Sequence, residues 1–311
     1  MLYPLGKDVN HMPIPPGYPG VILAILIWGS VSIFVRLADQ PAPVIVFARV
    51  VTAFLALTLY LRLRGQSIRL QGHWRLAVLS GITLCMTWLF FFKAVQATTI
   101  ANASLTYFLA PVLSIIWAFF LLGERLEKRA LAALGVSGAG ICLILSGYEF
   151  SLASGDFVGI LYCLAAALCY SLAVVMAKKL STMDPVQLAA AQMAVAAVIF
   201  LPVVATDPLH HPFTAVSVLA MILMGLIHSA LALALYYGGL RQVKVQHASI
   251  LSYIEPVSAP FYAFLIFQEV PSLLTLAGGL LIFVASLLTV QSGRPAAEST
   301  CNPPSKQGQP R

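Results

Sequence analysis

An apolar segment of membrane-spanning length occurs twice in this chain, and this repetition limits the folds that the chain can adopt. Residues 103–124, ASLTYFLAPVLSIIWAFFLLGE, return 145 residues later as residues 248–269, ASILSYIEPVSAPFYAFLIFQE. The two copies share a proline near the middle and a glutamate at the end, which are Pro111 with Pro256 and Glu124 with Glu269. Matches of these two kinds in one register indicate an internal duplication.

The composition places both copies in a membrane. Hydrophobic residues make up 60% of the 311 residues and charged residues 9%, whereas a soluble domain carries about 25% charged residues. A bilayer is crossed by about 20 consecutive apolar residues in a helix. The sequence therefore predicts an all-α integral membrane protein with ten transmembrane helices, at residues 18–36, 43–61, 75–92, 98–122, 130–148, 157–177, 186–205, 214–236, 246–267 and 272–290.

The basic residues between these spans predict the orientation of the chain. With the N-terminus in the cytoplasm, 15 of the 18 Lys and Arg residues fall in cytoplasmic segments, and only Arg36 and Lys93 fall at outer ends. Such a bias follows the positive-inside rule, so we expect a multi-pass protein of the cell inner membrane with both termini cytoplasmic. Because the bases are spread over many loops, the net charge of +7 does not indicate nucleic-acid binding.

Five spans per copy is an odd number, so the second copy must enter the membrane from the opposite side. The expected organisation is a cytoplasmic N-terminal segment (1–17), a first five-helix repeat (18–148), a second repeat of inverted topology (157–290) and a disordered cytoplasmic tail (291–311). Secondary transporters commonly have this architecture, with their substrate held near the midplane between the repeats.

Three motifs carry a resemblance to a known family. They are IWGSVSIFVR in the first span, FARVVTAF in the second, and the pattern A-S-x6-P-V-x6-F-x4-E in both copies of the duplicated segment. Over residues 18–290 the chain resembles the EamA-type transporters of the drug/metabolite transporter superfamily, and it is most similar to the bacterial ten-helix exporters of aromatic amino acids. The resemblance implies export of small organic solutes.

Two charged residues lie inside predicted spans. Glu255 is about 13 Å along its helix, where a charge costs roughly 2.5–3.5 kcal/mol on insertion scales. It is a candidate ligand for a substrate ammonium group or a proton carrier; a protonated structural glutamate and a salt bridge to an embedded arginine stay as alternatives. Arg49 is a candidate ligand for a substrate carboxylate or a structural partner, although we favour snorkelling of its guanidinium to the outer interface.

Other candidate site residues are apolar or neutral. Pro111 and Pro256 predict matched helix bends with a role in gating, and ordinary helix kinks are the alternative. Aromatic and polar residues toward span interiors are candidates to contact substrate, although plain helix packing would also explain each of them; they are Trp28, Trp88, Tyr107, Tyr253, His228 and its repeat counterpart Thr83. We expect His247, near a cytoplasmic end, to be solvated. The glycines of the fifth and tenth spans predict close helix packing or a dimer contact.

Several chemistries have no motif here: no Walker loop, metal-ligand spacing or nucleophile elbow is present. We therefore expect no cofactor or metal and no enzymatic activity. The predicted function is alternating-access export of small metabolites, with amino acids, and aromatic ones first, as the favoured class. Coupling to protons stays open, as does the choice between monomer and homodimer. The alternatives are a multidrug or nucleotide-sugar carrier of the same superfamily, a channel, or a membrane enzyme.

Overall fold

The computed structural model describes residues 15–69, 72–98, 106–146, 156–206, 212–268, 270 and 272–292. The start of the first duplicated segment, Glu269 and almost all of the two predicted terminal segments lie outside these residues. Within the described residues every regular element is helical, which confirms the all-α class.

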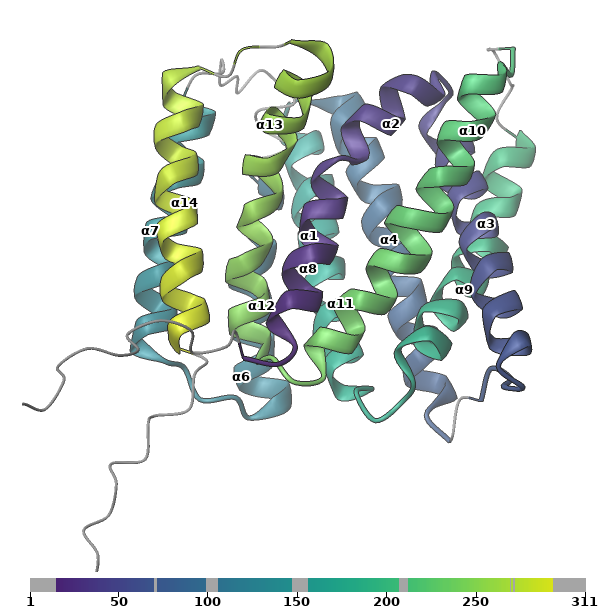
Figure 1. Ribbon diagram of the computed structural model, residues 1–311, viewed down its shortest axis with the longest axis horizontal. Coiled ribbons are helices and arrows are strands. Elements are labelled where there is room, and N and C mark those ends of the chain that lie inside the picture. The colour runs from purple at the N-terminus through teal and green to yellow at the C-terminus, as the bar shows by residue number, and fades with distance from the viewer. Residues whose placement is uncertain are drawn as a thin grey trace, which may run out of the picture.

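The helices follow one another along the chain and run roughly parallel or antiparallel in one bundle (Figure 1). Their bounds are α1 (Tyr18–Gly29), α2 (Val31–Ala38), α3 (Ala42–Leu63), α4 (Trp74–Ala97), α6 (Ala110–Leu122), α7 (Lys128–Leu145), α8 (Asp156–Lys179), α9 (Pro185–Thr206), α10 (Ala215–Leu223), η1 (Met224–Leu231), α11 (Ala232–Leu240), α12 (Val245–Leu251), η2 (Ser252–Ile254), α13 (Glu255–Phe267) and α14 (Leu273–Ser292).

Eight helical stretches in the described residues are long and apolar enough to cross a membrane. Three of them join shorter elements: α1 with α2, α10 with η1 and α11, and α12 with η2 and α13. Helix α6 is shorter, at 13 residues, and α7 begins with Lys128 and Arg129. These two helices lie at the predicted fourth and fifth spans but are not among the eight.

Three of the long stretches are interrupted near their middle. The chain breaks at Ser30 between α1 and α2, η1 is an eight-residue π-helix, and η2 is a short 3-10 helix. Pro111 and Pro256 each lie in the first turn of a helix, α6 and α13. A proline is tolerated at this point because its missing N–H would have no partner in the first turn. Each proline therefore begins a new helix rather than bending a continuous one.

The main helix pairs join the two halves of the chain. Helix α1 packs against α11, α3 against α9, α4 against α8, and α7 against α14. One large core cluster includes residues of α1, α3, α4, α8, α9 and α11, among them Ile25, Val50 and Phe200, which are fully buried. Gly140 and Gly278 meet where α7 crosses α14, and a Cβ on Gly140 would lie 2.7 Å from the carbonyl oxygen of Gly278. This contact fits the close packing that the sequence predicts for these glycines.

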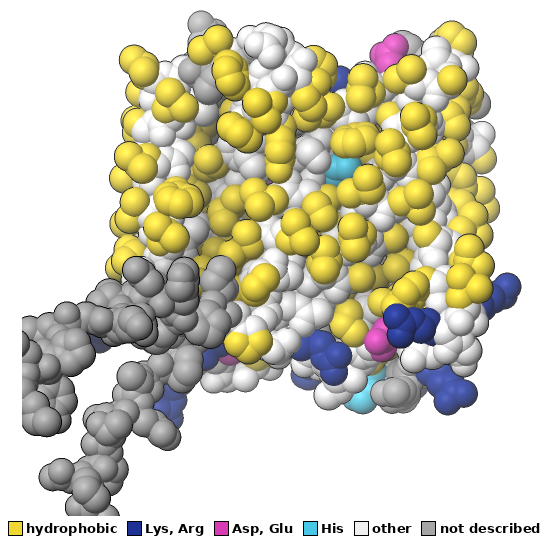
Figure 2. Space-filling model, in the orientation of Figure 1, with side chains coloured by type: hydrophobic (Ala, Val, Ile, Leu, Met, Phe, Trp, Pro, Cys, Tyr) yellow, Lys and Arg dark blue, Asp and Glu magenta, His cyan; other side chains and the backbone are white. Residues whose placement is uncertain are grey.

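The surface is divided between an apolar belt and a basic end. Figure 2 shows hydrophobic side chains over the flank of the bundle and most of the visible Lys and Arg side chains at the end where α1 begins and α14 finishes. Large apolar side chains such as Phe120, Val198 and Leu280 are between 63% and 72% exposed on the flank. Lipid, rather than water, is the solvent that suits such a flank.

Candidate functional site

Glu255 occupies an interruption in the middle of the bundle. It is the first residue of α13, directly after η2, and its carbonyl accepts a hydrogen bond from the Ser258 hydroxyl at 3.0 Å. Its side chain is exposed in the bundle. It nevertheless interacts electrostatically with Arg49, Tyr107 and Tyr170, which come from three other parts of the chain. Among the described residues its carboxylate has no hydrogen-bond or ion-pair partner. The carboxylate is therefore free to bind a ligand.

Arg49 of α3 is held inside the bundle. Its Nε donates a hydrogen bond to the Ser229 hydroxyl at 3.0 Å, and its guanidinium carbon lies 5.2 Å from the centre of the Trp88 ring. These contacts differ from the snorkelling that we favour from the sequence, because η1 supplies a hydroxyl partner and α4 an aromatic face. The two Nη atoms are left for another acceptor. Arg49 and Glu255 interact electrostatically, but no described ion pair within 4.0 Å joins them.

The π-helix η1 brings His228 and Ser229 to the same region. The indole Nε1 of Trp28 donates to the His228 carbonyl at 2.9 Å, and the Ser30 hydroxyl pairs with His228 Nε2 at 2.9 Å. Phe34 completes the contact, with its ring centre 4.7 Å from that of the imidazole. A π-helix shifts the backbone bonding by one residue and is often found at functional sites. Here it fixes both sides of the break between α1 and α2.

Aromatic rings from five segments form a continuous aromatic wall beside these charges. Ring centres of Phe91 and Tyr107 are 5.1 Å apart, and those of Tyr107 and Tyr170 are 5.9 Å apart. Tyr170 and Tyr236 interact electrostatically, and the Tyr236 and Trp28 rings lie 5.1 Å apart. Such a wall offers apolar faces, ring edges and hydroxyl groups to a flat or aromatic ligand.

The structure brings together five of the predicted site residues: Trp28, Trp88, Tyr107, His228 and Glu255, with Arg49 as a sixth. Tyr253 does not join them: it is buried among Ile141, Ile144 and Ile282, and its hydroxyl donates to the Phe108 carbonyl at 2.9 Å. The Thr83 hydroxyl donates to the carbonyl of Ser80 at 3.0 Å within its own helix.

Sequence reasoning missed Ser229, Tyr170 and Tyr236. The duplication contains a signal for the last of these, because Tyr236 is the counterpart of Phe91 at the offset of 145 residues. The Phe91 ring contacts Tyr107, and the Tyr236 ring contacts Trp28. The aromatic pair at equivalent positions of the two copies is therefore a sequence signal from which the aromatic wall could have been predicted.

The expectation of a solvated His247 is wrong. Its side chain is 2% exposed, and it contacts the Tyr18 hydroxyl and the Glu127 carboxylate. These partners come from α1 and from the segment between α6 and α7, far from His247 in the sequence. The position of His247 near the end of a span predicted a solvent-exposed side chain, because its partners are distant in the sequence and cannot be identified from it.

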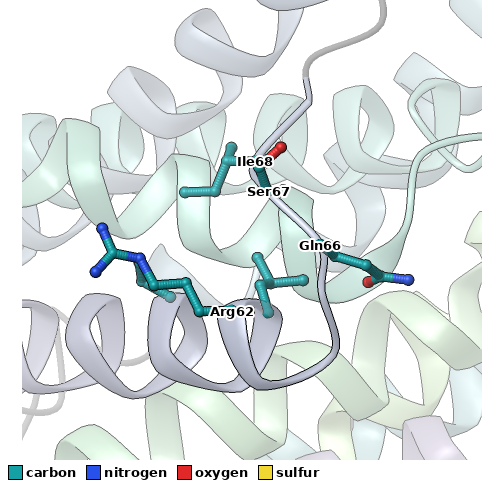
Figure 3. Close-up of a pocket in the computed structure, with 6 residues that line it drawn as sticks. Arg62, Gln66, Ser67 and Ile68 are labelled. Atoms are coloured by element: carbon teal, nitrogen blue, oxygen red, sulfur yellow. The ribbon is translucent and has the colours of Figure 1, made fainter.

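A separate pocket lies at the end of α3. It has a volume of about 210 Å³ and is lined by Thr58, Leu61, Arg62, Gln66, Ser67 and Ile68. Figure 3 shows it between the last turns of α3 and the loop that follows. None of its lining residues belongs to the group around Glu255, so the pocket is not part of the candidate site.

Known proteins resemble this chain over nearly its full length. The model of the EamA-like transporter family matches residues 15–146 and again residues 157–291. A protein of Archaeoglobus fulgidus, described only as an uncharacterized transporter, is 32% identical over 88% of this chain and 95% of its own length. The pseudopaline exporter CntI of Pseudomonas aeruginosa is 25% identical over 86% of this chain and 94% of its own.

A solved structure supports the same fold. It is 23% identical in sequence and covers 89% of this chain and 97% of its own, with a TM-score of 0.80. Together with the apolar flank and the eight membrane-length helices, the matches identify a multi-pass membrane protein. The chain belongs to the EamA-like transporter family.

Proposed function

We propose that this protein is a secondary transporter that exports small zwitterionic metabolites, with amino acids, and aromatic ones first, as the favoured class. The observation that carries the proposal is the Glu255 carboxylate, which among the described residues has no hydrogen-bond or ion-pair partner and interacts with the Arg49 guanidinium only electrostatically. A substrate with both an ammonium and a carboxylate group would bridge the two.

Each part of the site has a role in this binding. The Nη atoms of Arg49 and the Ser229 hydroxyl hold the substrate carboxylate, since a guanidinium matches a carboxylate in a bidentate geometry. Glu255 holds the ammonium group, and Tyr107 and Tyr170 add ring faces that attract a cation. The rest of the aromatic wall packs on the substrate side chain, where each aromatic pair contributes about 0.5–1.5 kcal/mol.

Ten crossing helices in two inverted five-helix repeats complete the proposal. Two consecutive matches to one family model support the duplication. The helix pairs support a twofold relation between the repeats, because exchanging the two repeats converts the α4–α8 pair into the α11–α1 pair and the α6–α8 pair into the α13–α1 pair. The odd number of spans in each proposed repeat makes that relation an inverted one. A twofold relation between the repeats lets the halves rock about a central site and open it alternately to each side.

The basic end of the bundle sets the direction in the membrane. Because Lys and Arg gather where α1 begins and α14 finishes (Figure 2), that end is the cytoplasmic one under the positive-inside rule. Both termini are then cytoplasmic, and the membrane is the cell inner membrane. The relative CntI is described as a pseudopaline exporter, which favours outward transport.

Two alternatives stay open. Glu255 has no hydrogen-bond or ion-pair partner among the described residues, so it can equally carry a proton that drives transport. A multidrug or nucleotide-sugar carrier of the superfamily is the second candidate; span one, which contains no acid, weighs against the mechanism of small multidrug pumps. A channel would reveal itself by conductance far above carrier turnover.

The test is efflux from proteoliposomes preloaded with tryptophan, tryptamine, indole-3-propionate, phenylalanine, threonine or a nucleotide sugar, with and without a pH gradient. We expect tryptophan efflux to exceed that of tryptamine, which lacks the carboxylate, and of indole-3-propionate, which lacks the ammonium group. The Glu255→Gln variant should lose tryptophan efflux by about 10- to 100-fold, because a hydrogen bond to a charged group contributes about 1.5–3 kcal/mol.

The same assay separates the alternatives. Gradient-dependent efflux that Glu255→Gln abolishes would make Glu255 the proton site. Release of the nucleotide sugar alone would contradict the amino-acid class. Full activity of Glu255→Gln on tryptophan would remove Glu255 from the substrate site.

A further inference from the structure

A polar cluster lies at the end of the bundle where α1 begins, well away from Glu255. It joins Tyr18 of α1 and the segment between α6 and α7 to Lys244 and the first turn of α12, and so it links the two halves of the chain. We call this cluster the clasp. Its members are Tyr18, Glu124, Glu127, Lys244, Gln246 and His247.

The centre of the clasp is the Glu127 carboxylate. One of its oxygens forms an ion pair with the Lys244 ammonium group, and the other lies 3.0 Å from His247 Nε2. The second imidazole nitrogen, Nδ1, contacts the Tyr18 hydroxyl. Glu127 thus holds a base from the second half on each of its oxygens, and through His247 it also reaches α1.

Backbone groups extend the clasp on either side of Glu127. The Glu127 N–H donates to Gln246 Oε1 at 3.2 Å, and Gln246 Nε2 donates to the Arg125 carbonyl at 3.2 Å. The carboxylate of Glu124 accepts the N–H of Val245, with oxygens at 3.0 and 3.1 Å. These bonds fix the start of α12 against the end of α6. The clasp therefore joins the backbone at the end of α6 to the backbone at the start of α12, and not only their side chains to one another.

The charges of the clasp are set for neutral pH. Burial acts to raise the pKa of Glu127, but the hydrogen bonds from Lys244 and His247 outweigh it and leave the pKa below its ordinary value. A carboxylate whose pKa is lowered in the folded state stabilises that state at every pH above its ordinary pKa. This stabilisation is lost only as the pH falls through the lowered pKa. His247 is faced by Tyr18, Glu127, Lys244 and Glu124. Around neutral pH, the Glu127 pairing is fully formed.

Close helix packing surrounds the clasp. Gly17 and Gly239 meet where α1 starts and α11 ends, and a Cβ on Gly239 would lie 2.4 Å from the Gly17 carbonyl oxygen. Neither residue can be enlarged without moving a backbone. At this end of the bundle the two halves are therefore joined by backbone contact as well as by the clasp.

We propose that the clasp is the gate at this end: it holds the two halves together in this conformation and must break in the conformation that admits substrate from the same side. The proposal rests on the proposed function, because only an alternating-access carrier needs both conformations. Each bond of the clasp crosses between segments that a rocking motion would separate. Glu127, Lys244 and His247 are thus positioning residues for the closed state and do not touch substrate.

The test measures distance rather than transport. Spin labels are placed at Leu126→Cys and Gln242→Cys, two exposed positions beside the clasp, in the full chain with Cys85, Cys142, Cys163, Cys169 and Cys301 changed to alanine. In nanodiscs, pulsed electron resonance should show one dominant short distance at neutral pH. Glu127→Gln and Lys244→Gln should each raise a longer-distance population about fivefold, which corresponds to about 1 kcal/mol.

Two further variants make the result specific. Charge reversal of both partners, Glu127→Lys with Lys244→Glu, should return much of the short-distance population, whereas Arg129→Gln, an exposed base next to the same segment, should change nothing. Unchanged distances in both single variants, or an equal shift with Arg129→Gln, would overturn the clasp as a gate. Because no substrate is present, failure of the efflux test would contradict the proposed function and leave the distance measurement standing.

Discussion

Glu255 and Arg49 are an acid and a base that share an interior without pairing. A charge in a membrane interior costs roughly 2.5–3.5 kcal/mol on insertion scales, and a direct ion pair would offset part of that cost. Arg49 is instead held by Ser229 and Trp88, and Glu255 has no described partner. A protein that keeps both charges apart leaves their pairing to a ligand.

Arg49 allows a test of the carboxylate half of this arrangement. We expect Arg49→Gln to weaken tryptophan binding by about 10- to 100-fold and to affect tryptamine far less, since tryptamine has no carboxylate. Arg49→Lys should fall between, because it keeps the charge but loses the planar fork. Isothermal titration calorimetry in detergent measures binding of both ligands, with Arg129→Gln as the surface control. Equal losses for tryptophan and tryptamine would show that Arg49 supports the fold and does not bind the carboxylate.

At the scale of elements, the interruptions place the site. The break at Ser30, the π-helix η1 and the 3-10 turn η2 lie in three different spans and supply Trp28, His228, Ser229 and Glu255. Two of these spans meet where Gly29 approaches α13 so closely that a Cβ would lie 1.9 Å from the Ser258 hydroxyl. The approach orients the start of α13, where Glu255 lies.

The close contact between Gly29 and Ser258 predicts how a methyl group at position 29 would change the stability of the protein. Gly29→Ala should lower the free energy of unfolding by about 1–3 kcal/mol, the usual cost of overpacking a tight contact. The double change Gly29→Ala with Ser258→Gly should recover most of the loss, because it removes the atoms that the new methyl group would meet. Thermal unfolding in one detergent compares the variants. A loss that Ser258→Gly does not reduce would place the strain elsewhere.

At the scale of the whole molecule, charge and apolar surface together predict one orientation. A cysteine at Gln66, in the loop after α3, should react with an impermeant maleimide only when the reagent can reach the cytoplasmic face of the membrane, as in permeabilised cells. A cysteine at Val270, which is 81% exposed between α13 and α14, should react in intact cells. Both are introduced into the cysteine-free chain described above. The opposite pattern would invert the proposed topology and the sense of the gate.

The sequence predicted the features that depend on composition and repetition, and it missed those that depend on distant contacts. The positions of the eight long helical stretches and of the acid at 255 follow from apolar runs and one matched register, whereas the bends predicted at Pro111 and Pro256 are helix starts. Ser229 could not be found, because its place in the site depends on its bond to Arg49, which is 180 residues away in the chain. His247 appeared solvated because its partner Glu127 is 120 residues away in the chain.

The pairing of helices across the halves has a consequence for biogenesis. Helices α1, α3, α4 and α7 find their main partners among α11, α9, α8 and α14, which are made later. At about 5–20 residues per second, the ribosome needs roughly 4–40 s to supply these partners, depending on the pair. During that time the newly inserted first half holds its future contact surfaces against lipid or an insertion factor. Quality control of this protein should therefore act on a half-made chain, and a deletion in the second half should expose the first to membrane proteolysis.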